Sequence, residues 1–128
     1  MDNLTHIPRS HIPPADTNGI KVLSILADGE IHQKVELIHV LGDDPRSALQ
    51  SLRGGTYGYW LIHNIGKKKG VYQLDKRHLQ GNSQEDSAAR LEREISLKML
   101  SRELAESEIK RLTKAIQAEH EALQRSLF

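Results

Sequence analysis

The chain contains no cysteine among its 128 residues, which excludes disulfide bonds and thiolate metal sites. It also lacks an apolar run of the roughly 20 residues that a membrane-spanning helix needs. Its first residues do not follow the charged-then-apolar order of a secretory signal. These absences are typical of the reducing cytoplasm, so we expect a cytoplasmic location and no membrane partner.

Motifs of catalysis are absent too. The sequence has no glycine-rich phosphate loop, no nucleophile elbow and no carboxylate cluster beyond Asp43-Asp44, which helix capping explains. The seven histidines do not show the paired spacing of metal ligands, since His32 and His39, for example, are seven residues apart. We therefore expect a protein that is not an enzyme and that uses no metal or cofactor.

Aromatic residues are few and unevenly placed. All three tyrosines and the only tryptophan fall between Tyr57 and Tyr72, and after Gly81 the only aromatic ring besides an imidazole is that of Phe128. The composition therefore changes near residue 80, from a part that can build a core to a part that offers only leucine and isoleucine. The segments expected from this change are a flexible N-terminal arm (1–16), a compact domain (17–79), a polar linker (80–87) and a long amphipathic helix (88–128).

Within the compact domain, capping residues and apolar spacing predict three short helices, near residues 16–27, 33–41 and 45–53. Residues 30–32 fit a short extended segment, whose Ile31 is expected to pair with a later hairpin. Two β-rich runs, 57–65 and 71–74, flank the turn 66–70, and its glycines favour an antiparallel hairpin. The predicted class is mainly α with a small β-hairpin, that is α+β.

The placement of basic residues is more informative than their number, because 18 Lys and Arg nearly balance 17 Asp and Glu. Three consecutive lysines at the hairpin tip repel one another, which packing does not explain and phosphate contact does. The outer face of the third helix is also polar and partly basic. The candidate DNA-binding residues are Arg46, Ser47, Gln50, Arg53, Lys67, Lys68 and Lys69.

The C-terminal segment has neither glycine nor proline from Ala88 to Leu127, and one stripe of large apolar residues runs along it. A helix with such a stripe needs a partner surface, and a coiled-coil dimer is the simplest one. Charges interrupt the heptad at Lys98, Arg102 and Glu119, so a short bundle and packing back onto the compact domain stay open. The candidate self-association residues are Leu91, Ile95, Met99, Ile109, Leu112, Ile116 and Leu123.

Residues 18–79 resemble the winged helix–turn–helix domains that are common in bacterial and phage regulators. The motifs that carry the resemblance are Leu26-x-x-Gly29, Glu36-Leu37-x-x-x-Leu41-Gly42, Ala48-Leu49-x-x-Leu52 and Gly70-x-Tyr72-x-Leu74. The resemblance implies a winged helix–turn–helix followed by a long C-terminal helix. It makes Pro45–Arg53 the recognition helix and Lys67–Lys69 the wing.

On this resemblance, Arg46 would read guanine and Gln50 adenine through paired hydrogen bonds. Ser47 and Arg53 would hold phosphates. One departure from the pattern is the pair Asp43-Asp44 at the start of the recognition helix. Carboxylates there repel the DNA backbone unless one of them is used as a helix cap.

The function expected from these features is sequence-selective binding of double-stranded DNA by a homodimer or higher oligomer. Regulation of transcription, in a phage or prophage, is the leading role. Two alternatives remain at the level of sequence. One is a DNA-binding component of phage replication, excision or packaging, and the other is a winged-helix adaptor that binds protein and not DNA.

Overall fold

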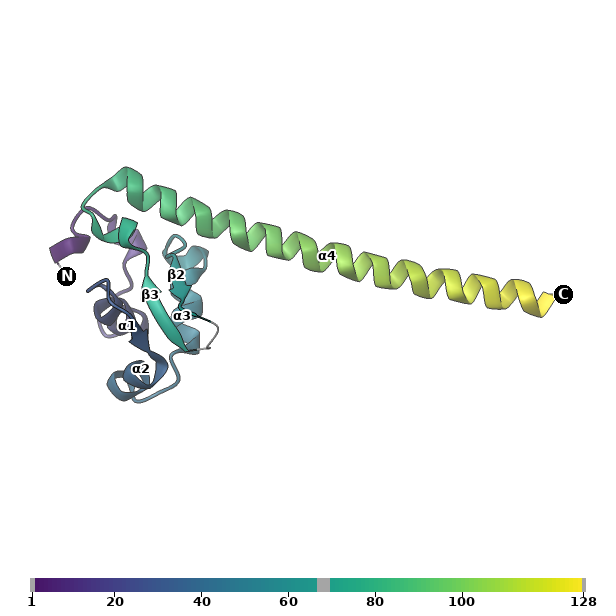
Figure 1. Ribbon diagram of the computed structural model, residues 1–128, viewed down its shortest axis with the longest axis horizontal. Helices are drawn as coiled ribbons and strands as arrows, with labels where there is room; N and C mark the ends of the chain where they lie inside the picture. The colour runs from purple at the N-terminus through teal and green to yellow at the C-terminus, as the bar shows by residue number, and fades with distance from the viewer. Residues whose placement is uncertain (1, 67–69, 128) are drawn as a thin grey trace. The chain divides into compact units, whose positions relative to one another are not determined.

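The computed structural model of the chain describes residues 2–66 and 70–127. These residues are mainly helical and carry a small three-stranded antiparallel sheet, which confirms the α+β class (Figure 1). The helices are α1 (Asn18–Leu26), α2 (Lys34–Leu41), α3 (Arg46–Arg53) and α4 (Ser83–Leu127). The strands are β1 (His32–Gln33), β2 (Ile62–Asn64) and β3 (Val71–Leu74). Within the described ranges, no helix is both long enough and apolar enough to cross a membrane.

The chain divides into two compact units, residues 1–94 and residues 95–128. The first unit contains the three short helices, the sheet and the first turns of α4. The second unit is the remainder of α4.

Local caps explain why the short helices begin where the sequence predicts. The Thr17 side chain accepts a hydrogen bond from the backbone N–H of Ile20 and so caps α1. Gln33 and Glu36 form a reciprocal capping box at the start of α2. Gly42 ends α2 with a φ of +70°, a left-handed conformation that costs glycine little.

The sheet has the strand order β1-β3-β2, and both pairs are antiparallel. Ile62 pairs with Leu74 and Asn64 with Tyr72, as expected for the hairpin. Strand β1, which adds to the hairpin, pairs with β3 through His32 and Gln33, not through Ile31 as predicted. Ile31 is exposed instead, so the pairing is shifted along the chain from the predicted residue.

The core of the first unit lies between the sheet and the short helices, and Trp60 is fully buried in it. Leu4 and Ile7 belong to the same core, with exposures of 2% and 6%. The backbone carbonyl of His11 accepts a hydrogen bond from Trp60 Nε1 at 2.8 Å. The expectation of a flexible arm over 1–16 is therefore corrected, because Leu4 and Ile7 of this segment are buried in the core.

The polar linker expected over 80–87 is also corrected, since α4 already begins at Ser83. The Asn82 side chain accepts hydrogen bonds from the backbone N–H groups of Gln84 and Glu85, at 2.9 and 3.3 Å. Polar and acidic residues suit the first turn of a helix. A polar composition therefore marked a capped helix start here, not a loop.

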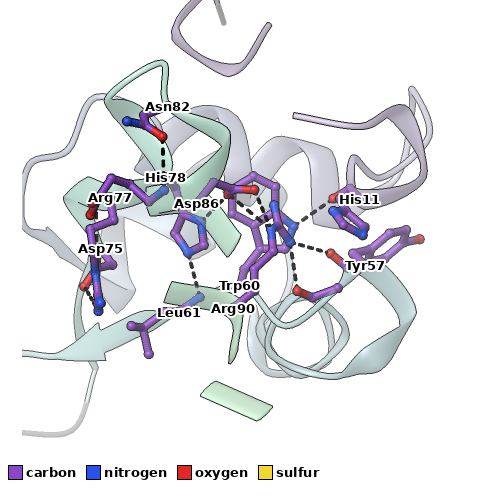
Figure 2. A network of polar contacts seen from close by, with 12 residues as sticks. His11, Tyr57, Trp60, Leu61, Asp75, Arg77, His78, Asn82, Asp86 and Arg90 are labelled. Atoms are coloured by element: carbon purple, nitrogen blue, oxygen red, sulfur yellow. Dashed lines mark hydrogen bonds and ion pairs between the residues drawn. The ribbon is translucent and has the colours of Figure 1, made fainter. Parts of the chain in front are cut away.

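A buried polar network holds the first turns of α4 in the first unit (Figure 2). The backbone N–H of Leu61 donates to His78 Nε2 at 3.0 Å, so the ring proton lies on Nδ1 and is donated to Asp86 Oδ1 at 2.7 Å. Burial lowers the pKa of His78, against the hydrogen bond to Asp86, which raises it. His78 is therefore neutral in the folded protein at neutral pH.

Arg90 completes this network from the second turn of α4 (Figure 2). Its Nε donates to the carboxylate of Asp86 at 3.0 Å, and its Nη1 donates to the carbonyls of Tyr57 and Gly58 at 2.9 Å each. The guanidinium lies 4.2 Å from the centre of the Trp60 ring, a distance suited to a cation–π contact. Residues up to Arg90 are thus integral to the fold of the first unit.

Candidate nucleic-acid interface

Helix α3 is strongly amphipathic, and this determines what it presents to solvent. Ala48, Leu49 and Leu52 are buried against the core. Arg46 and Gln50, one turn apart, are exposed on the other side. The polar outer face predicted for this helix is therefore exposed to solvent at Arg46 and Gln50.

A cleft of about 670 Å³ lies between α3 and the hairpin. It receives Arg46, Gln50 and Arg53 from α3, so three of the four predicted residues of that helix come together. The other residues that line it are Lys34, Asp44, Leu49, Asn64, Gly66, Gly70 and Tyr72. Ser47 does not line this cleft and faces a separate hollow of about 420 Å³.

The predicted wing residues Lys67, Lys68 and Lys69 lie outside the described residues. Gly66 and Gly70, the described residues on either side of them, both line the cleft. Gly66 and Gly70 have φ values of +69° and +89°, which glycine adopts without steric cost. The turn is closed at its base by a hydrogen bond from the Ile65 N–H to the Val71 carbonyl at 2.8 Å.

Arg53 is engaged by the protein itself. Its Nη2 donates to the carbonyl of Ile62 at 2.7 Å and to Asn64 Oδ1 at 3.3 Å, and its guanidinium lies 5.6 Å from the centre of the Tyr72 ring. Burial lowers the pKa of Arg53, but an arginine side chain remains charged at neutral pH. Arg53 therefore ties α3 to β2 and β3 and contributes a fixed positive charge to the cleft.

The two aspartates before α3 accept hydrogen bonds from backbone N–H groups close to them in the chain. Asp44 Oδ1 accepts a hydrogen bond from the Arg46 N–H at 2.9 Å, and Asp43 Oδ1 accepts one from the Asp44 N–H at 2.7 Å. The second carboxylate oxygen of Asp44 lies 3.8 Å from Lys34 Nζ. Asp44 therefore satisfies the backbone N–H of the first residue of α3, whereas the N-cap position itself is Pro45, which makes no side-chain cap hydrogen bond.

Sequence reasoning missed Lys34, Asn64 and Tyr72 as cleft residues. Lys34 comes from a different helix and is brought to the cleft because its backbone N–H donates to the Gly70 carbonyl at 2.7 Å. The alternation of the hairpin strands was a usable signal for the other two, since Asn64 and Tyr72 are cross-strand partners.

The predicted self-association residues of α4 that the structure describes are exposed. Their exposures run from 48% for Ile95 to 67% for Ile116. Leu100 and Leu104, which were not predicted, are similarly exposed. The side chain of Leu123 lies outside the described ones.

No family model, no curated protein and no solved structure matches the chain. The resemblance to winged helix–turn–helix domains therefore remains a prediction drawn from the motifs.

Proposed function

We propose that the first unit binds double-stranded DNA, with α3 in the major groove and the lysine turn on the phosphate backbone. The observation that carries the proposal is the cleft, where Arg46 and Gln50 line the same surface as the two glycines that flank the lysines. A helix fits the major groove, where arginine pairs with guanine and glutamine with adenine. Lys34, at the edge of the same surface, is suited to a phosphate contact.

We assign this binding to a self-associated regulator of transcription, of the winged helix–turn–helix kind found in bacteria and phages. A phage replication, excision or packaging protein would use the same surface. A protein-binding adaptor is the second candidate, and a separate observation favours it. The α2 region exposes several large apolar side chains to solvent, namely Ile31, Val35, Ile38 and Val40.

Salt dependence tests the phosphate contacts. The affinity of the full chain for random duplex DNA should fall steeply as salt rises, with a slope of about −0.9 on logarithmic axes for each phosphate neutralised. The variant Lys67→Ala/Lys68→Ala/Lys69→Ala should flatten this slope. The matched control Lys110→Ala/Arg111→Ala/Lys114→Ala removes the same charge from the second unit and should leave the slope unchanged.

Selection from a random duplex library tests the base contacts. Arg46→Ala and Gln50→Ala should each relax the preference at one base pair, by about 1–3 kcal/mol. Ser51→Ala is the control, because Ser51 is exposed on α3 but does not line the cleft. If the chain is not retained on any duplex at low salt, the DNA-binding proposal fails and the adaptor is favoured.

A further inference from the structure

In the second unit, charged residues occupy some of the a and d positions of the heptad, the positions that form the seam facing a partner helix. Ile109, Leu112 and Ile116 have the alternating 3-4 spacing that places Ile109 at a and Leu112 at d. Extended in both directions, the same frame puts Arg102 at a and Glu119 at d. Both side chains are exposed. Each would enter the seam of a helical pair with its full charge.

These two charges do not neutralise each other within one chain. Helix α4 runs through both positions, and 17 residues of helix span about 25 Å. In a parallel, in-register coil each position meets its own copy, so arginine would face arginine and glutamate would face glutamate. Such pairs repel, and they would lie in the least hydrated part of the interface.

An antiparallel pair removes the conflict, because an a residue of one helix then faces a d residue of the other. The register that sets Arg102 against the second copy's Glu119 also sets Ile109 against Leu112 and Ala105 against Ile116. Charge meets opposite charge, large apolar residues meet at the centre, and a small residue meets a large one. One register therefore satisfies these three layers, while Lys98, at a further d position of the same frame, is set against Leu123 of the second copy.

We propose that α4 is an interaction surface for a second copy of this chain, and that the two helices pair antiparallel about a two-fold axis between Lys110 and Arg111. In this register Arg102 and Glu119 act as a specificity device, since they form two equivalent ion pairs only when the helices run in opposite directions. Leu100 and Leu104 lie outside the seam. The proposal concerns the second unit and does not depend on DNA binding.

Charge reversal in the full chain tests the direction of pairing. Arg102→Glu alone or Glu119→Arg alone turns both ion pairs into repulsions, so the dimer should weaken by about ten-fold or more in analytical ultracentrifugation. The double variant Arg102→Glu/Glu119→Arg restores both pairs and should recover the affinity. In a parallel coil each reversal replaces one like-charge pair by another, so unchanged single variants would overturn the proposal.

Disulfide cross-linking supplies an independent readout, because the natural chain has no cysteine. Under oxidation, chains with Ala105→Cys should not link to one another, nor should chains with Ile116→Cys. An equimolar mixture of the two, unfolded and refolded together, should give a linked dimer, since a disulfide needs Cα atoms within about 7 Å. Linking of Ala105→Cys chains to themselves, or a full chain that stays monomeric at all accessible concentrations, would refute the antiparallel pair.

Discussion

Arg90 concentrates several roles in one side chain. It pairs with a buried carboxylate, donates to two loop carbonyls and covers the face of Trp60. Burial raises the pKa of Asp86, but hydrogen bonds from Arg90 and His78 outweigh it and hold that pKa below its ordinary value. Removing one member of such a set leaves the others desolvated and unpaired.

Arg90→Ala should therefore lower the free energy of unfolding by about 3 kcal/mol, the lower end of what breaking a buried ion pair costs. Arg93→Ala is the matched comparison on the same helix. Arg93 makes a hydrogen bond to the Arg53 carbonyl at 3.2 Å, so its loss should cost about 1 kcal/mol. Urea denaturation of both variants measures the difference, and equal midpoints would contradict the account.

His78 should make stability depend on pH. Its pKa is lowered in the folded protein by burial, so the unfolded chain binds the proton more readily. The contribution of neutral His78 to the free energy of unfolding is thus fully present above the pKa of about 6.5 that a histidine has in the unfolded chain. It is lost as the pH falls from there towards the lower pKa of His78 in the folded protein. Protonation would also place a second donor against the Leu61 N–H. His78→Gln should reduce the loss of stability between pH 7.5 and pH 5.5, measured by thermal denaturation, whereas an unchanged loss would exclude His78 as its source.

The sequence predicts the position of a side chain where the local pattern of one helix determines it. It does not predict the contacts of a side chain whose hydrogen-bond partners lie in another element. Arg46 and Gln50 follow from the amphipathic spacing of α3 alone. The roles of Arg53 and Arg90 depend on carbonyls 9 and 32 residues away along the chain. No single helix or strand contains both ends of either contact, so the pattern of one element does not reveal them.

At the scale of elements, helix starts were foreseeable where the cap lies next to the helix. Thr17 and Gln33 are examples. The exact residues of β1 were not, because its pairing is decided by β3, almost 40 residues later. The start of α4 was missed although its cap, Asn82, is also adjacent, because the polar composition of residues 80–87 is typical of a linker as well as of a capped helix start.

Two of the left-handed glycines, Gly42 and Gly58, give a matched test of the turns between elements. An added Cβ at Gly42 meets no heavy atom of the described residues within 4 Å, so Gly42→Ala should cost only the strain of a positive φ, about 1–2 kcal/mol. At Gly58, where φ is +76°, the Cβ would lie 2.6 Å from the His11 ring and 3.0 Å from Arg90. Gly58→Ala should therefore cost at least about 1 kcal/mol more. Thermal melts of the two variants compare these costs directly, and equal destabilisation would show that the His11 contact yields without strain.

At the scale of the whole molecule, the boundary between the units differs from the one that composition suggested. The core and the buried network end within residues 1–94, not at residue 79. A chain truncated after Glu94 should therefore fold. It should also be monomeric at concentrations where the full chain pairs, because the proposed seam is removed.

Truncation after Ser87 is the sharper companion experiment. It leaves Asp86 and His78 in place but removes Ala89 and Arg90, both buried. The shorter chain should unfold at lower urea than the chain ending at Glu94, with a deficit of about 3 kcal/mol or more. The chain ending at Glu94 should keep the base preference of the full protein but bind DNA about 100-fold more weakly, since a second linked site no longer adds to the affinity. If this fragment binds as tightly as the full chain, pairing through α4 makes no contribution to DNA affinity.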